Sequence, residues 1–311
     1  MMKRNKKLLI LVIILAVAIA ACVAVKKLAP TENGDASEVS FSEIKQEDVT
    51  AIEWKNSDGI NKFIKNSEGW VLEEDEAFPA NAVILDSMEN SVVSAKSTRA
   101  LTDVNASEYG IGENSDTVAV YKKDGTVVKM IFGDINDITN EYYMQVEGDS
   151  NVYMIAAGVK DTFDRKREDL IKMEQIPNMS DAEKIIMTKD GKTLELLYSE
   201  NGEGEEKTSE WKSGDTVLST DKTDALKDSL IGIIWNKCVD YNATAEELNG
   251  FGLDEPKAKL TVETADETAE FLFGNTLGED VYVRLSNSNM VYTTDKAVFD
   301  SIVTDTATLV D

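Results

Sequence analysis

The chain has 311 residues, of which 42% are hydrophobic and 29% are charged, so it is long and apolar enough to fold into two domains of ordinary size. Its formal net charge of -26 disfavours binding to nucleic acid or to anionic lipid headgroups, because both are negatively charged. It contains no histidine, which excludes Ser-His-Asp and Cys-His catalysis and metal sites with imidazole ligands.

The N-terminal segment is predicted to anchor the chain to a membrane. Residues 3–7 are mostly basic, and residues 8–25 form an uninterrupted apolar run. At 1.5 Å per residue this run spans about 27 Å, which is enough for the core of a bilayer. Because the positive charge precedes the run, we expect the N-terminus in the cytoplasm and the body outside, held in the cell membrane by a single anchor.

Lipidation is an alternative for the same segment. Residues 19–22, Ile-Ala-Ala-Cys, are typical of a bacterial lipoprotein signal in which Cys22 becomes lipidated, although the apolar run continues beyond it. A cleaved secreted form is a third alternative, and all three place the body outside the cytoplasm. We assign residues 1–27 to the anchor or lipoprotein signal. Residues 28–46, with proline, glycine, serine and acidic residues, are predicted to be a flexible linker.

A first repeat is predicted over residues 47–175. Its Asp-Gly pairs at 58 and 124 are typical of hairpin turns, and a charged helical segment at 165–173 ends before Pro177. Alternating apolar residues predict strands at 49–54, 60–64, 69–72, 118–121, 127–132, 142–146 and 152–155, and helical spacing predicts helices at 80–95 and through Val159 and Phe163.

A second repeat is predicted over residues 176–311 in the same order. Its strands are expected at 185–187, 194–198, around Trp211, and at 258–262, 268–273, 281–285 and 290–293, with a final helix from about Lys296. The main helix is expected to run from a cap at Ser219 to about Cys238. Cys238 follows an apolar helical stretch, which predicts a small buried hydrophobe rather than a reactive thiol.

The same aromatic and glycine residues recur in both repeats. Tyr109-Gly110-Ile111 matches Phe251-Gly252-Leu253, each followed by a Phe-Gly pair at 132–133 or 273–274, and each preceded by a tryptophan. Two tyrosines spaced ten residues apart then follow: Tyr143 and Tyr153 in the first repeat, Tyr282 and Tyr292 in the second. Hairpin-linked strands with one main helix predict an α+β fold of two similar tandem units, each a largely antiparallel sheet, after the N-terminal anchor.

These features resemble the bacterial family called domain of unknown function 4340. The segment Phe-Gly-Leu-Asp-Glu-Pro at 251–256 is similar to the family's Tyr-Gly-Leu-Asp-x-Pro, and the charged segment at 164–170 and the N-terminal anchor also match. The first copy, at 109–114, lacks the Asp and the Pro. The resemblance implies a membrane-tethered extracytoplasmic protein found alongside ABC-type transporter components. It carries over no catalytic residues.

The residues predict no reaction centre, cofactor or metal site. Gly133 and Gly274 each follow a phenylalanine at an expected strand end, so we expect turn glycines rather than phosphate cradles. Tyr143, Tyr153, Tyr282 and Tyr292 are candidates for lining a groove, with packing on the sheet as the alternative. No carboxylate pair stands out for acid-base work, so we do not expect an enzyme.

Two functions are consistent with this sequence. The first is a structural or interaction protein that is tethered outside the membrane and is an accessory of an ABC-type transporter or envelope complex. The alternative is a lipoprotein that binds a glycan or solute in a cleft between the two repeats. The expected partners are the membrane and transporter subunits, with no nucleic acid.

Overall fold

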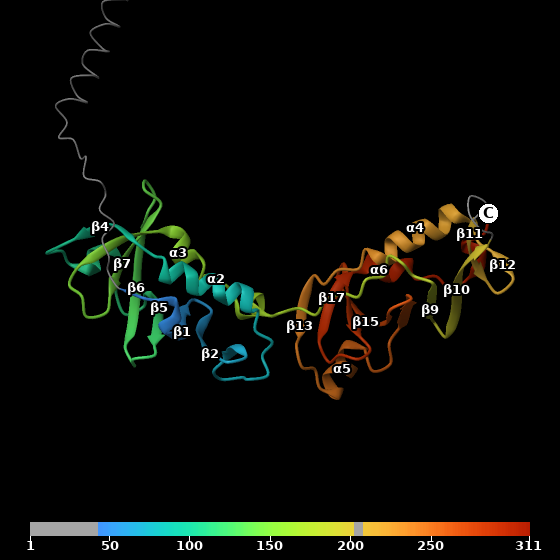
Figure 1. The fold of residues 1–311 in the computed structure, drawn as a ribbon, viewed down its shortest axis with the longest axis horizontal. Helices are drawn as coiled ribbons and strands as arrows, with labels where there is room; N and C mark the ends of the chain where they lie inside the picture. The colour runs from blue at the N-terminus through green and yellow to red at the C-terminus, as the bar shows by residue number, and fades with distance from the viewer. Residues whose placement is uncertain (1–42, 202–207) are drawn as a thin grey trace, which may run out of the picture. The chain divides into compact units, whose positions relative to one another are not determined.

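The computed structural model describes residues 43–201 and 208–311 (Figure 1). The predicted anchor at 8–25 and the lipidation candidate Cys22 lie outside these residues. Within them, no helix is long and apolar enough to cross a membrane. The chain divides into two compact units. Unit 1 comprises the described residues up to Asn61 together with Ser87–Asp164, and unit 2 comprises Lys62–Asp86 and Arg165–Asp311.

The strands of the described residues form two sheets. The first has eight strands in the order β3-β2-β1-β5-β6-β7-β8-β4. Its strands are β1 (Val49–Asn56), β2 (Gly59–Asn66), β3 (Gly69–Leu72), β4 (Ser97–Leu101), β5 (Asp116–Lys122), β6 (Val127–Asn136), β7 (Glu141–Val146) and β8 (Val152–Ala156). The helices of this half of the chain are η1 (Gln46–Asp48), α2 (Ala82–Val93), η2 (Ala106–Tyr109), α3 (Ala157–Asp161) and η3 (Arg167–Leu170).

The second sheet has nine strands in the order β12-β11-β10-β9-β14-β15-β16-β17-β13. Its strands are β9 (Lys184–Lys189), β10 (Lys192–Asn201), β11 (Thr208–Ser213), β12 (Thr216–Val217), β13 (Lys237–Asp240), β14 (Ala258–Glu263), β15 (Thr268–Leu277), β16 (Asp280–Leu285) and β17 (Val291–Asp295). The helices are α4 (Thr220–Ile231), α5 (Ala245–Phe251), α6 (Lys296–Ser301) and η5 (Thr306–Thr308). Apart from β12, the order matches that of the first sheet strand for strand. The predicted α+β class with largely antiparallel sheets is confirmed.

Hairpins join most neighbouring strands, and their turns follow the local sequence. Asp190 and Gly191 between β9 and β10 both have positive φ, of 53° and 72°. Such a pair forms the tight turn whose twist matches the two flanking strands, and glycine and aspartate tolerate it best. Gly59 and Gly125, each after an aspartate, also have positive φ, at the β1–β2 and β5–β6 connections. The hairpin turns predicted at the Asp-Gly pairs at 58 and 124 are confirmed, and Asp190-Gly191 forms a third turn of this kind.

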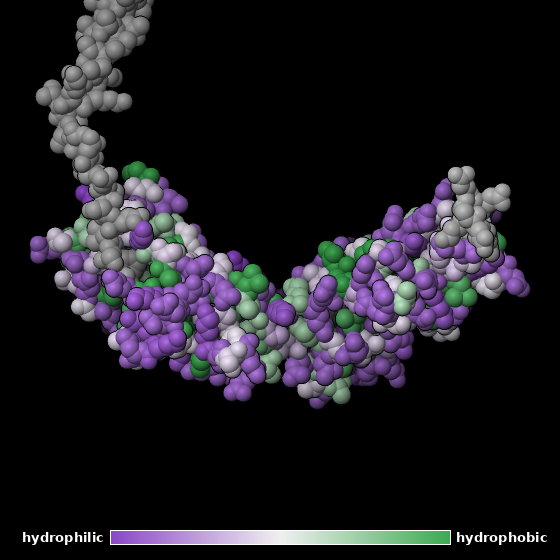
Figure 2. Space-filling model, viewed as in Figure 1, coloured by the Kyte–Doolittle hydropathy of each residue, from purple (hydrophilic) through white to green (hydrophobic). Residues whose placement is uncertain are grey.

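The main helices bury narrow apolar stripes. In α2, Leu85, Met88 and Val92 are almost fully buried at helical spacing, and in α4 the buried apolar residues are Leu226 and Leu230. Helix α4 lies beside α6 (Figure 1). On the face shown in Figure 2, hydrophilic residues dominate and hydrophobic areas are small, as expected for a body rich in carboxylates.

Two predicted helices are shorter than expected. The helix predicted to reach Cys238 ends at Ile231, and Cys238 lies instead in β13, opposite Tyr292 of β17. The apolar residues beyond Ile231 continue a helical pattern, but Ile233 is buried outside the helix and Trp235 stacks on Tyr292. Tertiary pairing therefore overrides local propensity here. The charged helix predicted at 165–173 is reduced to the single 3₁₀ turn η3.

Candidate functional site

The shared aromatic and glycine residues form the same packed corner in both repeats. Gly110 directly follows η2 and Gly252 directly follows α5, and both have the left-handed conformation that stops a helix. The ring before each glycine then packs on a strand tyrosine. Tyr109 lies 4.7 Å from Tyr143, and Phe251 lies 4.9 Å from Tyr282, measured between ring centroids. Two of the four groove candidates are therefore used in packing.

Gly133 and Gly274 let this corner close, and their predicted role as turn residues at strand ends is wrong. They lie inside β6 and β15, next to the register irregularities that follow Phe132 and Phe273. A Cβ on Gly133 would lie 2.1 Å from the Tyr109 carbonyl oxygen, and one on Gly274 would lie 2.2 Å from that of Phe251. A strand interior tolerates glycine where another backbone approaches this closely. The contact is tertiary, so local turn signals could not predict it.

The other two candidate tyrosines lie on β8 and β17, and both are buried. In unit 1 the Tyr153 hydroxyl donates to Asp149 Oδ2 at 2.6 Å, and burial raises the pKa of Tyr153, with a contribution from the Asp149 carboxylate. In unit 2 Tyr292 stacks on Trp235, with ring centroids 4.5 Å apart and ring planes 11° apart. Each candidate tyrosine is therefore engaged within its own unit.

Trp235 and Tyr292 together hold the backbone of Glu174, just before the second sheet. The Glu174 N–H donates to the Tyr292 hydroxyl, and the Trp235 Nε1–H donates to the Glu174 carbonyl, each at 2.9 Å. The repeat pattern does not single out Trp235, because no tryptophan stands at the matching position of the first repeat. The feature that could have identified it is an aromatic residue placed just before an edge strand.

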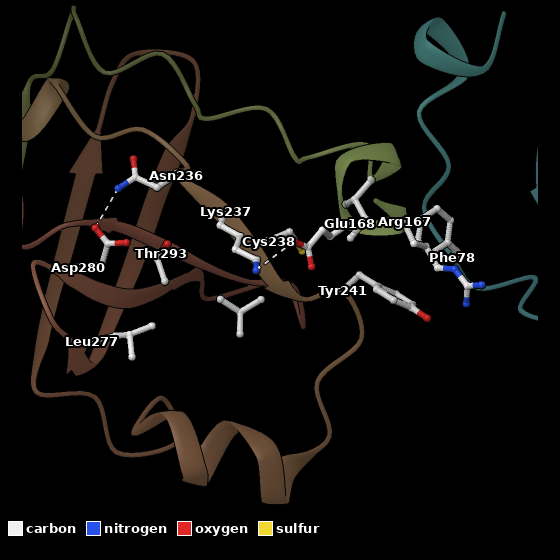
Figure 3. Close-up of a pocket in the computed structure, with 12 residues that line it drawn as sticks. Phe78, Arg167, Glu168, Asn236, Lys237, Cys238, Tyr241, Leu277, Asp280 and Thr293 are labelled. Atoms are coloured by element: carbon white, nitrogen blue, oxygen red, sulfur yellow. Dashed lines mark hydrogen bonds and ion pairs between the residues drawn. The ribbon is translucent and has the colours of Figure 1, made fainter. Parts of the chain in front are cut away.

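A cavity of about 600 Å³ lies in unit 2 beside β13 (Figure 3). Its walls are mostly apolar: Phe78, Ile171 and Cys238 are buried, whereas Val239 and Leu277 are 37% and 53% exposed. Pockets of this size with apolar walls are where proteins usually bind small molecules or side chains of a partner.

The polar groups around this cavity are bound to other protein groups. Lys237 Nζ lies 3.3 Å from Glu168 Oε1, and Asn236 Nδ2 donates to Asp280 Oδ1 at 3.1 Å (Figure 3). Arg167 pairs with Glu74, and the Tyr241 hydroxyl donates to Asp75. The last bond, together with burial, raises the pKa of Tyr241 to about 12. A ligand would therefore meet apolar surface inside a rim of internally paired charges.

Cys238 is the thiol of this cavity, and its environment makes it unreactive. The side chain is 4% exposed, which confirms the prediction of a small buried residue. Burial, assisted by the nearby Asp240 charge, raises the pKa of the thiol to about 11. A thiol nucleophile needs the opposite shift. Among the described residues, no group of three or more acidic or cysteine side chains could hold a metal ion.

Comparison with protein families identifies the chain. The family model described as "Domain of unknown function (DUF4340)" matches residues 70–233 and again residues 218–311. The chain belongs to the DUF4340 family. The first match begins at Trp70 and the second begins just before α4, so both the Trp strand and the C-terminal aromatic strands lie within the DUF4340 matches. The comparisons found no match among curated proteins or among solved structures.

Proposed function

We propose that this DUF4340 protein is a membrane-tethered extracytoplasmic structural or interaction protein that serves an ABC-type transporter or envelope complex. The apolar run at 8–25 with its preceding basic residues supports the tether. The family resemblance supports the transporter context. The residues that recur in both repeats support a structural role, because their rings and glycines are used in packing the same corner twice.

We further propose that the body arose as a tandem duplication, with repeats at 47–175 and 176–311 that each comprise a largely antiparallel sheet and one main helix. The common strand order of the two sheets supports this. The positions of α2 and α4 support it as well, because each helix connects the strand at one edge of its sheet to the strand at the other: α2 follows β3 and precedes β4, and α4 follows β12 and precedes β13. A duplicated scaffold of this kind offers a large surface for contact with another protein.

The contact with the partner is proposed at the cavity beside β13. The observation that carries this is the combination of an apolar wall, a rim of internally paired charges, and an edge strand. In the described sheet β13 is the outermost strand and pairs with β17. An extended segment of the partner could add to this edge by backbone hydrogen bonds and place an apolar side chain in the cavity.

Site-specific photocrosslinking tests this proposal in intact cells. A photoreactive residue at Val239 or Leu277 is expected to form an adduct with a transporter membrane subunit, identified by mass spectrometry. Leu197 and Val217 are the matched controls, because they are 43% and 52% exposed on other strands of the same sheet. Adducts of equal yield at all four positions, or none at Val239 and Leu277, would contradict the proposed contact.

A further inference from the structure

A second cavity, of about 420 Å³, lies in unit 1 next to the packed corner described above. Small residues form one wall, because Gly110, Gly112 and Gly133 all border it. Polar side chains form the rest of the wall together with Phe132. They are Glu113, Asn114, Ser115, Asp116, Asp134, Tyr142 and Lys160.

The strand registers show which residues occupy the same place in the second repeat. Asp116 is opposite Phe132 in the β5–β6 pair, and Ala258 is opposite Phe273 in the β14–β15 pair. The same comparison matches Tyr142 of β7 to Val281 of β16, since Tyr142 pairs with Ile135 and Val281 pairs with Thr276, each two residues beyond the strand glycine.

Lys160 of α3 corresponds to Phe299 of α6 by position in the sequence. Each residue follows a valine in the short helix that comes directly after β8 or β17. Three apolar positions of the second repeat are therefore polar in the first. Ala258 and Val281 are almost fully buried, and Phe299 packs on Phe273 with ring centroids 6.2 Å apart.

The polar residues of the first repeat form a connected group around Lys160. Its Nζ lies 2.9 Å from Asp116 Oδ2 and 2.6 Å from Asp164 Oδ1, and 5.5 Å from the centroid of the Tyr142 ring. Replacing an apolar corner by a partly buried ion pair gives little stability, since desolvation offsets the attraction. Protein interiors are normally packed without voids, so a purely structural corner would be expected to have side chains in place of this cavity. Stability alone therefore does not account for this change, which places polar groups around a cavity.

The charges of the cavity restrict the ligand. Asp134 and Glu113 add two carboxylates to the pair that surrounds Lys160, so the wall is net negative and disfavours phosphates and carboxylates. A bare amine would find carboxylates but would be repelled by Lys160. A hydroxyl group suits both, because it donates to a carboxylate and accepts from an ammonium or an amide. The aromatic Tyr142 and Phe132 add apolar surface to the same wall.

We infer that this cavity binds a neutral sugar residue. The inference concerns unit 1 and is independent of the partner contact proposed at β13. A free sugar and a residue within a glycan chain share this chemistry, so the test must include both.

Saturation-transfer NMR on the full chain, held in a detergent without a sugar headgroup, tests the inference. The probes are glucose, N-acetylglucosamine and the tetramer of N-acetylglucosamine, all of which are neutral. Gly112→Phe is the blocking variant, because Gly112 borders the cavity and a Cβ there meets no atom within 4 Å, so a large ring can be introduced at this wall without backbone strain. We expect at least one probe to bind the parent chain, and at least tenfold weaker binding in Gly112→Phe and in Asp134→Asn.

Lys296→Met is the matched control for Lys160→Met. Both lysines form a pair with an aspartate four residues later on equivalent helices, but Lys296 does not border this cavity. Lys160→Met should weaken binding and Lys296→Met should not. Binding of the tetramer alone would identify a glycan chain as the source, and binding of monomers would identify free sugars. The inference is overturned if no probe binds the parent chain, or if a probe binds Gly112→Phe as well as the parent.

Discussion

The packed corner of each repeat forms only because Gly133 and Gly274 have no Cβ atom. At Gly133 and Gly274 the atom that glycine lacks would overlap a backbone carbonyl oxygen rather than the end of a flexible side chain. A clash with backbone is relieved only when an entire element moves. The ring contacts of Tyr109 and Phe251 depend on the same short distance, so each glycine controls both the helix end and the aromatic pair.

Gly133→Ala is expected to destabilise the chain by about 1–3 kcal/mol, the usual cost of overpacking a close contact. The free energy of unfolding from urea denaturation measures it. Gly158→Ala is the control, and it is expected to increase the free energy of unfolding. No atom lies within 4 Å of a Cβ at this position, and alanine stabilises a helix such as α3 by up to about 1 kcal/mol relative to glycine. Equal stabilities for the two variants would contradict the assigned role of Gly133.

Cys238 is expected to resist thiol reagents while the protein is folded. Its pKa is raised to about 11, so the thiol remains protonated at pH 8, whereas the unfolded chain has the ordinary value of 9.0. In a Cys22→Ser background, Ellman's reagent should label Cys238 far more slowly in native buffer than in denaturant. Rapid labelling of the native chain at pH 8 would contradict the burial of this thiol.

The same shift predicts how stability depends on pH. Folding raises the pKa, so the folded chain holds the proton more tightly than the unfolded chain does. The contribution of Cys238 to stability is therefore complete below pH 9.0 and is lost as the pH rises toward about 11. Cys238→Ala should abolish this part of the alkaline loss, which denaturation curves between pH 8 and 11 measure.

Among the elements, the segment around Glu174 depends on two side chains of the second sheet. Tyr292→Phe keeps the ring stacked on Trp235 but leaves the Glu174 N–H without its hydroxyl acceptor. We expect amide exchange at Glu174 to accelerate at least tenfold, measured by hydrogen exchange, with a stability loss of about 0.5–1.5 kcal/mol.

Tyr153→Phe is the matched control for this experiment. It removes the equivalent hydroxyl of the first repeat, which donates to Asp149 and not to this segment. Its effect on exchange at Glu174 should be negligible. If both variants accelerated amide exchange at Glu174 equally, general destabilisation rather than the loss of one acceptor would explain the result.

How well the sequence predicted each element depends on where its stabilising contacts lie. The Asp-Gly hairpins are local, and they were predicted correctly. Strands β4 and β13 were missed because they are short and partly polar, and each is defined by pairing with β8 or β17. Helix α5 was also missed, although Thr244 and Glu247 form a capping box that its sequence displays.

The residues that line the two cavities could not be predicted from local sequence patterns for the same reason: their contacts are not local. The four tyrosines were identified from their spacing, which reports strand geometry and not the surroundings of each ring. Lys160 and Asp116 were not singled out, because their polarity is informative only after the strand register places them opposite Phe299 and Ala258. A repeat alignment that scored changes of polarity could have found them.

For the whole molecule, the predicted topology is tested by proteolysis of intact cells. With the wall removed, added protease should digest the body while a cytosolic control protein survives, because the basic residues before the apolar run keep only the N-terminus inside. Cys22→Ala distinguishes the two kinds of anchor. Loss of a lipid-dependent mass shift supports lipidation, and unchanged membrane retention supports a transmembrane helix. A body protected from protease would contradict the topology.

The common strand order also determines how the chain must fold. Within each sheet most neighbours are hairpin partners that form in microseconds, but β1 must meet β5, and β9 must meet β14, across the longest intervening segments. Residues 57–115 separate the first pair and residues 190–257 the second. The β4–β8 and β13–β17 pairings are also non-local. Closing such loops costs entropy before any contact offsets it, and the cost grows with loop length, so the β1–β5 and β9–β14 pairings should limit the folding rate. Substitutions at Val120 or Leu260 would then slow folding, whereas those at hairpin tips would mainly speed unfolding.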